Sequence, residues 1–156
     1  MTITLVPMTQ PEYDDWHESS VATYAQEFVE SGILTPEEAR KRADREFAEL
    51  LPDGLATENH LLWGAHDEAG TLVGTVWVAL VPERTPPHSF VYGLDVNADQ
   101  RRKGYGRAIM EVAMEECRQR GIATMGLNVF GHNDTARRLY ERLGFQVAST
   151  SMRIDL

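Results

Sequence analysis

The sequence is poor in cysteine, in cations and in long apolar runs, and each shortage excludes a class of protein. Its one cysteine, Cys117, rules out an internal disulfide. Cys117 lies in an apolar helical stripe, which predicts a buried structural thiol and is typical of a reduced, cytoplasmic setting. No apolar run approaches the roughly 20 residues of a membrane helix. The first residues show no basic region followed by an apolar stretch, so we expect neither a membrane span nor a signal peptide.

The charge balance argues against a nucleic-acid partner. The chain has 15 Lys and Arg against 24 Asp and Glu, a net charge of −9, whereas binding to a phosphate backbone needs an excess of cations. An acidic protein is instead compatible with a cationic acceptor such as an amine. At 156 residues, with 42% hydrophobic and 25% charged residues, the chain fits a single domain spanning residues 1–156.

The order of local signals predicts an α/β (α+β) fold with a mixed sheet. Thr9 and Thr35 each precede a proline and a glutamate at capping-box spacing, which predicts two early helices that end near Gly32 and Leu51. The pattern after the glycine pair at 104 and 106 predicts a parallel strand–helix–strand crossover. Strands are expected over 2–6, 60–65, 71–81, 89–96 and 123–130, with one or two more over 145–156, and further helices over 107–120 and 135–143.

One short loop gathers glycines and cations. Residues 101–107 read Arg-Arg-Lys-Gly-Tyr-Gly-Arg and hold four of the chain's 15 Lys and Arg, between a strand pattern and a helix pattern. Glycines at alternate positions let the backbone curl, so that several N–H groups converge, and the positive end of the following helix faces the same point. The loop therefore predicts a seat for a small anion such as phosphate, with an ordinary solvated turn as the alternative. It is neither a dinucleotide fingerprint, which needs a third glycine, nor a P-loop.

A second motif turns these observations into a family resemblance. The stretch from Asn133 to Phe145 reads Asn-x-x-Ala-x-x-Leu-Tyr-x-x-x-Gly-Phe, and the loop reads Arg-x-x-Gly-x-Gly. With this order and spacing, the chain resembles the GNAT superfamily of acetyl-CoA-dependent N-acetyltransferases. The two motifs span residues 89–146, and the early helices and hairpin match the family's layout. The resemblance implies a central mixed sheet of six to seven strands flanked by about four helices.

The resemblance also implies acetyl-CoA as the cosubstrate, with its pyrophosphate on the loop and its pantetheine arm beside exposed strand backbone. No metal is implied. The residues that the resemblance assigns to the cofactor are Leu94, Val96, Arg101, Arg102, Lys103, Gly104, Tyr105, Gly106, Arg107, Asn133, Ala136 and Tyr140.

The chemistry implied is direct attack of an amine on the thioester. Tyr140 occupies the place of the family's usual general acid, although helix spacing alone favours a core aromatic. The family's glutamate base has no counterpart, because Phe90 and Asn128 stand at the two expected places. Asp95 and an ordered water chain remain the alternatives for the base.

The resemblance predicts an N-acetyltransferase that acts on a primary amine of a small molecule, peptide or protein. Glu27, Glu30 and Asp53 are candidates for holding a cationic acceptor, with ordinary solvated acids as the alternative. A CoA-binding module without catalysis, or a transferase for another acyl group, is kept as a second interpretation. A homodimer is compatible with the resemblance, although no surface patch in the sequence requires one.

Overall fold

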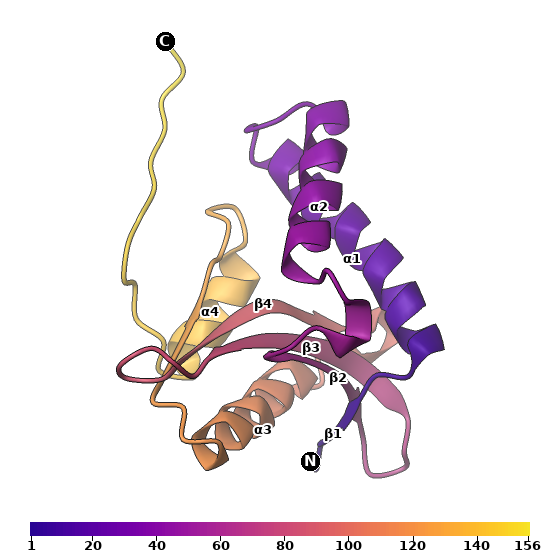
Figure 1. Ribbon diagram of the computed structural model, residues 1–156. Coiled ribbons are helices and arrows are strands. Elements are labelled where there is room, and N and C mark those ends of the chain that lie inside the picture. Colours follow the sequence, from indigo (N-terminus) through magenta and orange to yellow (C-terminus); the bar gives the residue numbers. More distant parts are fainter.

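The computed structural model describes all residues from 1 to 156 and shows one twisted sheet with helices on both faces (Figure 1). Helices α1 and α2 cover one face, and α3 lies against the other. None of the helices combines the length and apolar character that crossing a bilayer requires. The strands are β1 (Thr4–Pro7), β2 (His60–His66), β3 (Leu72–Val81), β4 (His88–Val96) and β5 (Thr124–Leu127), and the helices are α1 (Gln10–Glu30), α2 (Pro36–Leu50), α3 (Tyr105–Gln119) and α4 (Asp134–Arg142).

The sheet confirms the predicted mixed topology. Its five strands lie in the order β1-β2-β3-β4-β5. The first four pair antiparallel, whereas β4 and β5 pair parallel through the crossover that contains α3. The glycine loop therefore lies where β4 ends and α3 begins, at the carboxyl end of a strand, which is where α/β folds place their ligands.

Both early helices begin as their sequences predict. The Thr9 side chain accepts from the Glu12 N–H at 3.3 Å, and the Glu12 carboxylate accepts from the Thr9 N–H at 2.8 Å. Thr35 and Glu38 form the same capping box at the start of α2. Reciprocal bonds of this kind satisfy N–H groups that the first helical turn leaves free.

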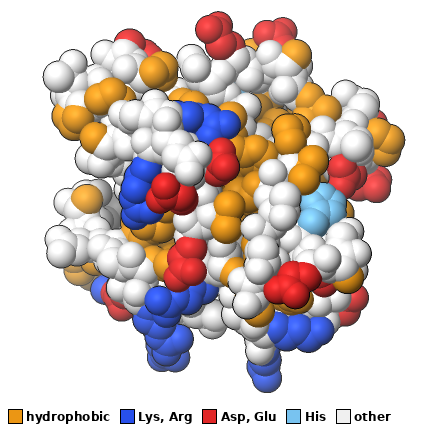
Figure 2. Space-filling view, turned by 90° about the horizontal axis from the view of Figure 1, so that it is seen from below, with side chains coloured by type: hydrophobic (Ala, Val, Ile, Leu, Met, Phe, Trp, Pro, Cys, Tyr) orange, Lys and Arg blue, Asp and Glu red, His pale blue; other side chains and the backbone are white.

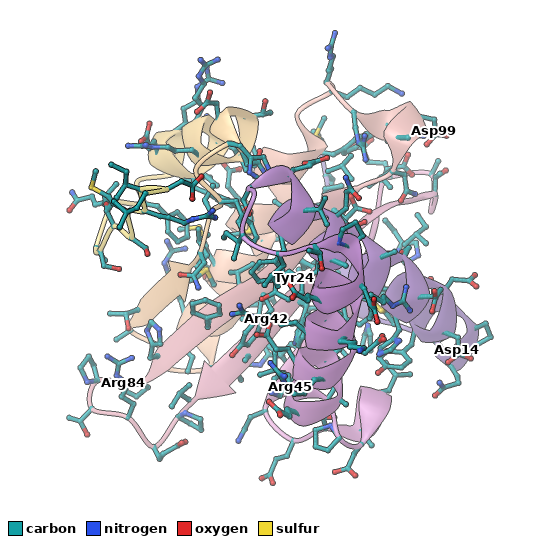
Figure 3. The ribbon with its side chains drawn as sticks, turned by 90° about the horizontal axis from the view of Figure 1, so that it is seen from above. Asp14, Tyr24, Arg42, Arg45, Arg84 and Asp99 are labelled. Atoms are coloured by element: carbon teal, nitrogen blue, oxygen red, sulfur yellow. The ribbon has the colours of Figure 1, made fainter.

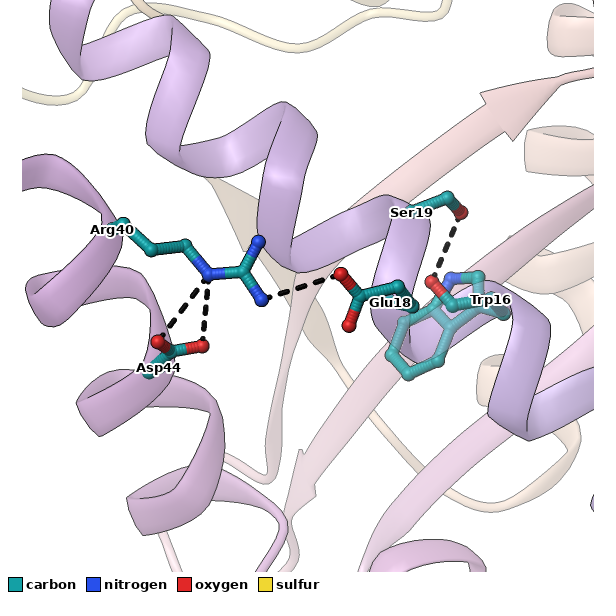
Figure 4. A network of polar contacts seen from close by, with 5 residues as sticks. All are labelled: Trp16, Glu18, Ser19, Arg40 and Asp44. Carbon is teal, nitrogen blue, oxygen red and sulfur yellow. Dashed lines mark hydrogen bonds and ion pairs between the residues drawn. The ribbon is translucent and has the colours of Figure 1, made fainter. Parts of the chain in front are cut away.

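Polar contacts hold α1 beside α2. Arg40 of α2 reaches Glu18 of α1 at 3.3 Å and Asp44 of its own helix at 3.2 Å (Figure 4). Further along, the Tyr24 hydroxyl and the Arg42 guanidinium both donate to the Glu46 carboxylate, at 2.5 and 2.9 Å, and Figure 3 shows Tyr24 and Arg42 close together beside α2. Ion pairs between residues four apart thus cover much of the charged face of α2.

Two cores of different character lie on the two faces of the sheet. Strand β3 serves both, because alternate side chains point to opposite faces: Val76 and Val78 face α3, whereas Trp77 faces α1 and α2. The α3 side is mainly aliphatic and contains Cys117, 3% exposed, as predicted for a structural thiol. The α1–α2 side is aromatic, and Trp77 lies 5.4 Å from the ring of Phe47. Seen from below, a strip of apolar side chains also reaches the surface between charged groups (Figure 2).

The prediction of six to seven strands is wrong in number. Residues 145–156 form no strand, and β5 ends at Leu127 instead of continuing to residue 130. Gly144, with a φ of 100°, directs the chain away from the body, so that the last residues project as an extended segment (Figure 1). The alternating pattern of this segment indicates strand propensity, but a strand also requires a neighbour for its backbone, and this segment has none within the chain.

Candidate functional site

The site is organised by a split between β4 and β5. Parallel pairing of the two strands stops at Val91 and Leu127, yet β4 continues to Val96. At Tyr92 a β-bulge interrupts the register with β3, because Trp77 pairs with Gly93 while Val78 pairs with Val91. Beyond the split, β4 pairs only with β3, so backbone groups on its other side are free to meet an extended ligand, as an added strand would.

The glycine loop presents a run of free N–H groups. Arg102 and Gly104 both adopt left-handed conformations, with φ of 63° and 84°. Helix α3 starts at Tyr105 without a side-chain cap. No backbone N–H group from Arg101 to Arg107 donates to another protein atom. An uncapped helix start behind a curled loop is suited to an anion, because the N–H dipoles and the helix dipole point the same way.

The cations of the loop are not equivalent. Arg101 donates from Nε to the Val96 carbonyl at 3.1 Å, which ties the loop to the end of β4. Lys103 donates to Gln100 at 3.2 Å, and Arg107 pairs with Glu111 at 2.8 Å. Arg102 forms no ion pair and no hydrogen bond through its side chain, so it is the loop cation most available to a ligand.

Gly106 joins the loop to the second motif. A Cβ atom at this position would lie 3.3 Å from Leu139 Cδ2 and 3.8 Å from Val96 Cγ2. The absence of a side chain therefore lets the first turn of α3 approach both β4 and α4. The two sequence motifs, which are some 30 residues apart, meet at this glycine.

Tyr140 is half-buried on α4 and its hydroxyl has no hydrogen-bond partner in the protein. Its ring packs edge-on against Phe145 with centroids 5.7 Å apart. Burial, and to a smaller extent the charge of Glu27, raise the pKa of the Tyr140 phenol to about 12. A phenol in this state stays protonated at neutral pH and has its proton free to give.

Asn133 and Ala136 lie in the loop and first turn of α4, on the same side as Tyr140. The Asn133 side-chain oxygen accepts from the Ala136 N–H at 3.2 Å and caps the helix. This bond uses the carbonyl half of the amide and leaves its NH2 group unpaired. The predicted role of Asn133 as a donor to the cofactor is compatible with the cap.

Asp95, a candidate base, is at the exposed end of β4. Its side chain is 66% exposed and lies 3.8 Å from the Arg101 guanidinium. Surrounding protein raises the pKa of Asp95, while Arg101 acts in the opposite direction. The contact with Arg101 favours a role in holding the loop. At the family's usual place for a base, Phe90 packs against Tyr92 with ring centroids 4.7 Å apart.

An acidic hollow of about 500 Å³ lies between α1 and the start of α4. The pKa of Glu27 is raised, mainly by burial. The charge of His132 acts to lower this pKa, and the charge of Glu30 acts to raise it. His132 Nε2 lies 3.4 Å from the Glu30 carboxylate. Asp53, the third predicted acid, lies outside this hollow, before a short 3₁₀ turn at Gly54–Ala56. The lining residues are Ala22, Thr23, Gln26, Glu27, Glu30, His132 and Asn133.

The sequence gives no sign that His132 lines this hollow, because no spacing rule connects the loop before α4 with the middle of α1. The contact between the two segments arises only because β5 brings the chain back beside the open end of the sheet. The same return of the chain after β5 brings Tyr140 close enough to Glu27 for the Glu27 charge to raise the pKa of the Tyr140 phenol.

Comparisons with known proteins agree with this geometry. The family model described as "Acetyltransferase (GNAT) family" matches residues 12–145. YycN of Bacillus subtilis, named an N-acetyltransferase, is 36% identical over 97% of both chains. A mycothiol acetyltransferase of Propionibacterium freudenreichii is 37% identical over 89% of this chain and 43% of its own length. The crystal structure of Bacillus subtilis YycN superposes with a TM-score of 0.96 at 35% identity, covering 99% of each chain.

Proposed function

Because the chain belongs to the GNAT family of acetyltransferases, we propose that it transfers an acetyl group from acetyl-CoA to a primary amine. The observation that carries the proposal is the run of unpaired N–H groups from Arg101 to Arg107 at the uncapped start of α3. The relatives are named as N-acetyltransferases, which favours an enzyme over a CoA-binding module without catalysis.

The glycine loop, the free side of β4 and the Tyr140 hydroxyl together support a path for the cofactor. The pyrophosphate would accept hydrogen bonds from the loop, with Arg102 adding charge. The pantetheine amides would pair with the free side of β4 beyond Val91, around Leu94. The thioester would then lie between the end of this strand and the Tyr140 hydroxyl on α4. The fit rests on donors that have no other partner in the protein.

The reaction follows from these positions. The neutral amine attacks the thioester carbon and forms a C–N bond, and the carbonyl oxygen becomes an oxyanion that free N–H groups of β4 stabilise. The C–S bond then breaks, and Tyr140 gives its proton to the departing thiolate. The amine loses its own proton to solvent or to a carboxylate at the acceptor side. The products are an N-acetylated amine and coenzyme A.

The acidic hollow supports a cationic acceptor. Glu27 is half-buried without a cationic side chain of Lys or Arg beside it, and it is close enough to Tyr140 to influence the phenol. An ammonium group bound there would neutralise a carboxylate that is otherwise poorly solvated. Glu27 would then accept the proton that the ammonium must lose before attack, which gives a base where the family's usual glutamate is missing.

The proposal is tested by following thiol release from acetyl-CoA with a panel of primary amines, including diamines, aminoglycosides and peptides. We expect thiol release that depends on both substrates and an acetylated amine detected by mass spectrometry. Propionyl-CoA and succinyl-CoA run in parallel test the alternative acyl groups. The proposal fails if no acyl-CoA yields acetylated or acylated product with any amine while coenzyme A itself binds tightly.

A further inference from the structure

Strand β4 contains a glycine that the protein itself does not require. Gly93 has no positive φ, unlike the glycines of the turns, so its backbone conformation suits any residue. No atom lies within 4 Å of a Cβ built at this position. The other glycines of the sheet, Gly64, Gly74 and Gly126, would each place a Cβ 3.3 Å or less from a neighbour. A strand glycine with neither reason marks a place that a ligand approaches closely.

The β-bulge brings Gly93 and the Tyr92 ring to the same face of the sheet. Gly93 pairs with Trp77, and residues directly opposite each other on antiparallel strands point to one face. Tyr92, the extra residue of the bulge, packs its ring 4.7 Å from the Trp77 ring. The opening at Gly93 therefore lies beside Tyr92 on the α1–α2 face, where the β4 backbone has just lost its β5 partner. Bulges commonly re-aim side chains next to functional sites.

Tyr92 is the exposed member of a cluster of flat rings, here called the aromatic surface, which consists of His60, Trp77, Phe90 and Tyr92. The Tyr92 ring lies 4.7 Å from that of Phe90, and 6.2 Å from that of His60 at an angle of 19°. Nevertheless, 42% of Tyr92 is exposed. A ring that its neighbours hold in place and that stays open to solvent is prepared for stacking, because no side chain must be ordered when a ligand binds.

The ionisable groups near the aromatic surface are already paired or neutral. Burial, and to a smaller extent the charge of Glu46, raise the pKa of Tyr92, so this carboxylate lies nearby. Glu46 already accepts from the Arg42 guanidinium at 2.9 Å. The Trp77 indole N–H donates to His60 Nδ1 at 2.9 Å, and burial lowers the pKa of His60, which keeps the imidazole neutral at pH 7. The aromatic surface therefore suits an uncharged ring better than a second cation.

The aromatic surface and the acidic hollow lie on the same side of the sheet. Phe130 lies 5.8 Å from His132, which lines the hollow, and 6.4 Å from Tyr24. Tyr24 in turn donates to Glu46, whose charge reaches Tyr92. Both regions thus border the α1–α2 side of the split, from which an acceptor would approach the thioester.

We propose that the acceptor is a primary amine that carries an aromatic ring, and that this ring stacks on Tyr92 over the opening at Gly93. The inference rests on the proposed function and narrows its acceptor from any primary amine to an arylalkylamine. The ring takes no part in the transfer of the acetyl group. Its contact with Tyr92 orients the amine nitrogen toward the thioester. Diamines and aminoglycosides, which bring further cations instead of a ring, are poor acceptors.

Steady-state acetylation of a matched set of amines tests the proposal. Phenethylamine and phenylbutylamine carry a ring at two spacings from the nitrogen, and phenylalaninamide carries it as a peptide N-terminus does. Butylamine lacks a ring, and putrescine has a second cation in its place. We expect kcat/KM for at least one amine with a ring to exceed that for butylamine about tenfold. A ratio below about threefold, or a preference for putrescine, would overturn the proposal.

Variants of Tyr92 separate stacking from a general loss of activity. Tyr92→Ala should bring the ratio of kcat/KM between the best amine with a ring and butylamine close to one. Tyr92→Phe should keep the ratio, because the ring alone stacks. Val6→Ala is the control, since Val6 is 43% exposed but lies on β1, at the far edge of the sheet. Survival of the ratio in Tyr92→Ala, or its loss in Tyr92→Phe, would contradict stacking.

Variants of Gly93 test the opening beside the ring. Gly93→Ala and Gly93→Val should fold, because the backbone conformation suits any residue and the space is open. Their melting temperatures should rise, since glycine is unfavourable in a strand. Nevertheless, kcat/KM for the amines with a ring should fall about tenfold more than that for butylamine. An unchanged ratio would overturn the proposal, whatever the melting temperature.

Failure of this inference is distinguishable from failure of the proposed function. If butylamine and putrescine are acetylated as well as the amines with a ring, the proposed function holds and the inference fails. If no amine is acetylated, the proposed function fails, and calorimetry of phenethylamine with the chain and coenzyme A decides on the aromatic surface. Binding that Tyr92→Ala abolishes would support the inference, and absence of binding would contradict it.

Discussion

The loop at residues 101–107 and the hollow beside α1 lie at the same open end of the sheet but carry opposite charge. The loop offers backbone donors and the cations of Arg101, Arg102, Lys103 and Arg107, whereas the hollow offers the carboxylates of Glu27 and Glu30. Tyr140 belongs to neither region. Its hydroxyl has no hydrogen-bond partner in the protein, and the charge of Glu27, from the hollow, contributes to its raised pKa.

In the proposed function, this difference separates two tasks. Phosphate recognition would depend on backbone geometry, which two glycines and one helix start determine locally. Acceptor recognition would depend on side chains from α1 and from the loop before α4, which tertiary structure brings together. The account therefore predicts that variants of the loop affect coenzyme A, variants of the hollow affect the amine, and variants of Tyr140 affect the chemical step itself.

The largest effect is expected from Tyr140→Phe. Removal of the hydroxyl removes the proton donor for the thiolate, so kcat should fall about 100-fold, within the range for loss of a general acid. The Michaelis constants for both substrates should stay within about twofold, because the ring remains in its place against Phe145. A kcat within about threefold of the wild type would remove Tyr140 from the mechanism.

Gly104→Ala should weaken coenzyme A binding about tenfold. A side chain at a φ of 84° costs roughly 1–2 kcal/mol, and relief of that strain would rotate the N–H groups of the loop. Gly70→Ala is the matched control, because Gly70 has a φ of 83° in the turn between β2 and β3, with nothing within 4 Å of an added Cβ. Calorimetry should show weaker binding only for the loop variant, and equal binding by both would count against the loop.

Glu27→Gln should raise the Michaelis constant of a cationic amine about fivefold, the effect of losing a partly exposed ion pair of about 1 kcal/mol. The constant for acetyl-CoA should not change. Gln26→Ala, from the same lining, serves as the control. A change confined to acetyl-CoA would contradict the assignment of the hollow to the acceptor.

The same substitution has a defined effect on stability. The folded state raises the pKa of Glu27 above its ordinary 4.5, mainly through burial, so its carboxylate is less stable folded than unfolded. The free energy of unfolding of the wild type therefore falls as the pH rises from below 4.5 through the raised pKa of Glu27. Glu27→Gln should melt a few degrees higher than the wild type at pH 7, and this advantage should vanish near pH 4. A gain in stability with a loss of acceptor binding is typical of a functional residue.

The smallest effect is expected from Arg102→Ala. Arg102 has no protein partner, so its loss should leave the fold unchanged and weaken coenzyme A binding about threefold at low salt. Arg118→Ala, on the exposed surface of α3, is the control because Arg118 pairs with Glu115 at 3.2 Å. The difference between the two variants should shrink as salt is added, and a difference that salt does not reduce would exclude a charge effect.

Much of the fold was predictable because its signals are local. The capping boxes at Thr9 and Thr35 and the glycine loop each depend on a few neighbouring residues, and the structure has each in its predicted place. The strand count was not predictable, because residues 145–156 have the pattern of a strand but no partner in their own chain. The split of β4 from β5 depends on where pairing stops, and no residue near Val91 signals it.

The candidate site shows the same difference between local signals and contacts that only tertiary structure creates. The loop and Tyr140 are candidates that the motifs suggest, whereas the proximity of His132 to Glu30 and of Glu27 to Tyr140 depends on segments more than 100 residues apart. Position-by-position reasoning identified Glu27 and Glu30 as acids but could not separate them from Asp53, which lies elsewhere.

The central claim is that the curled loop before α3 holds the pyrophosphate of coenzyme A. Titration calorimetry of the purified wild-type chain with coenzyme A tests it most directly, with 3′,5′-ADP as a competitor that lacks the pyrophosphate linkage and the pantetheine arm. The account predicts one coenzyme A site per chain with micromolar affinity, and far weaker binding of the competitor. No heat of binding, or equal binding of the two compounds, would contradict it.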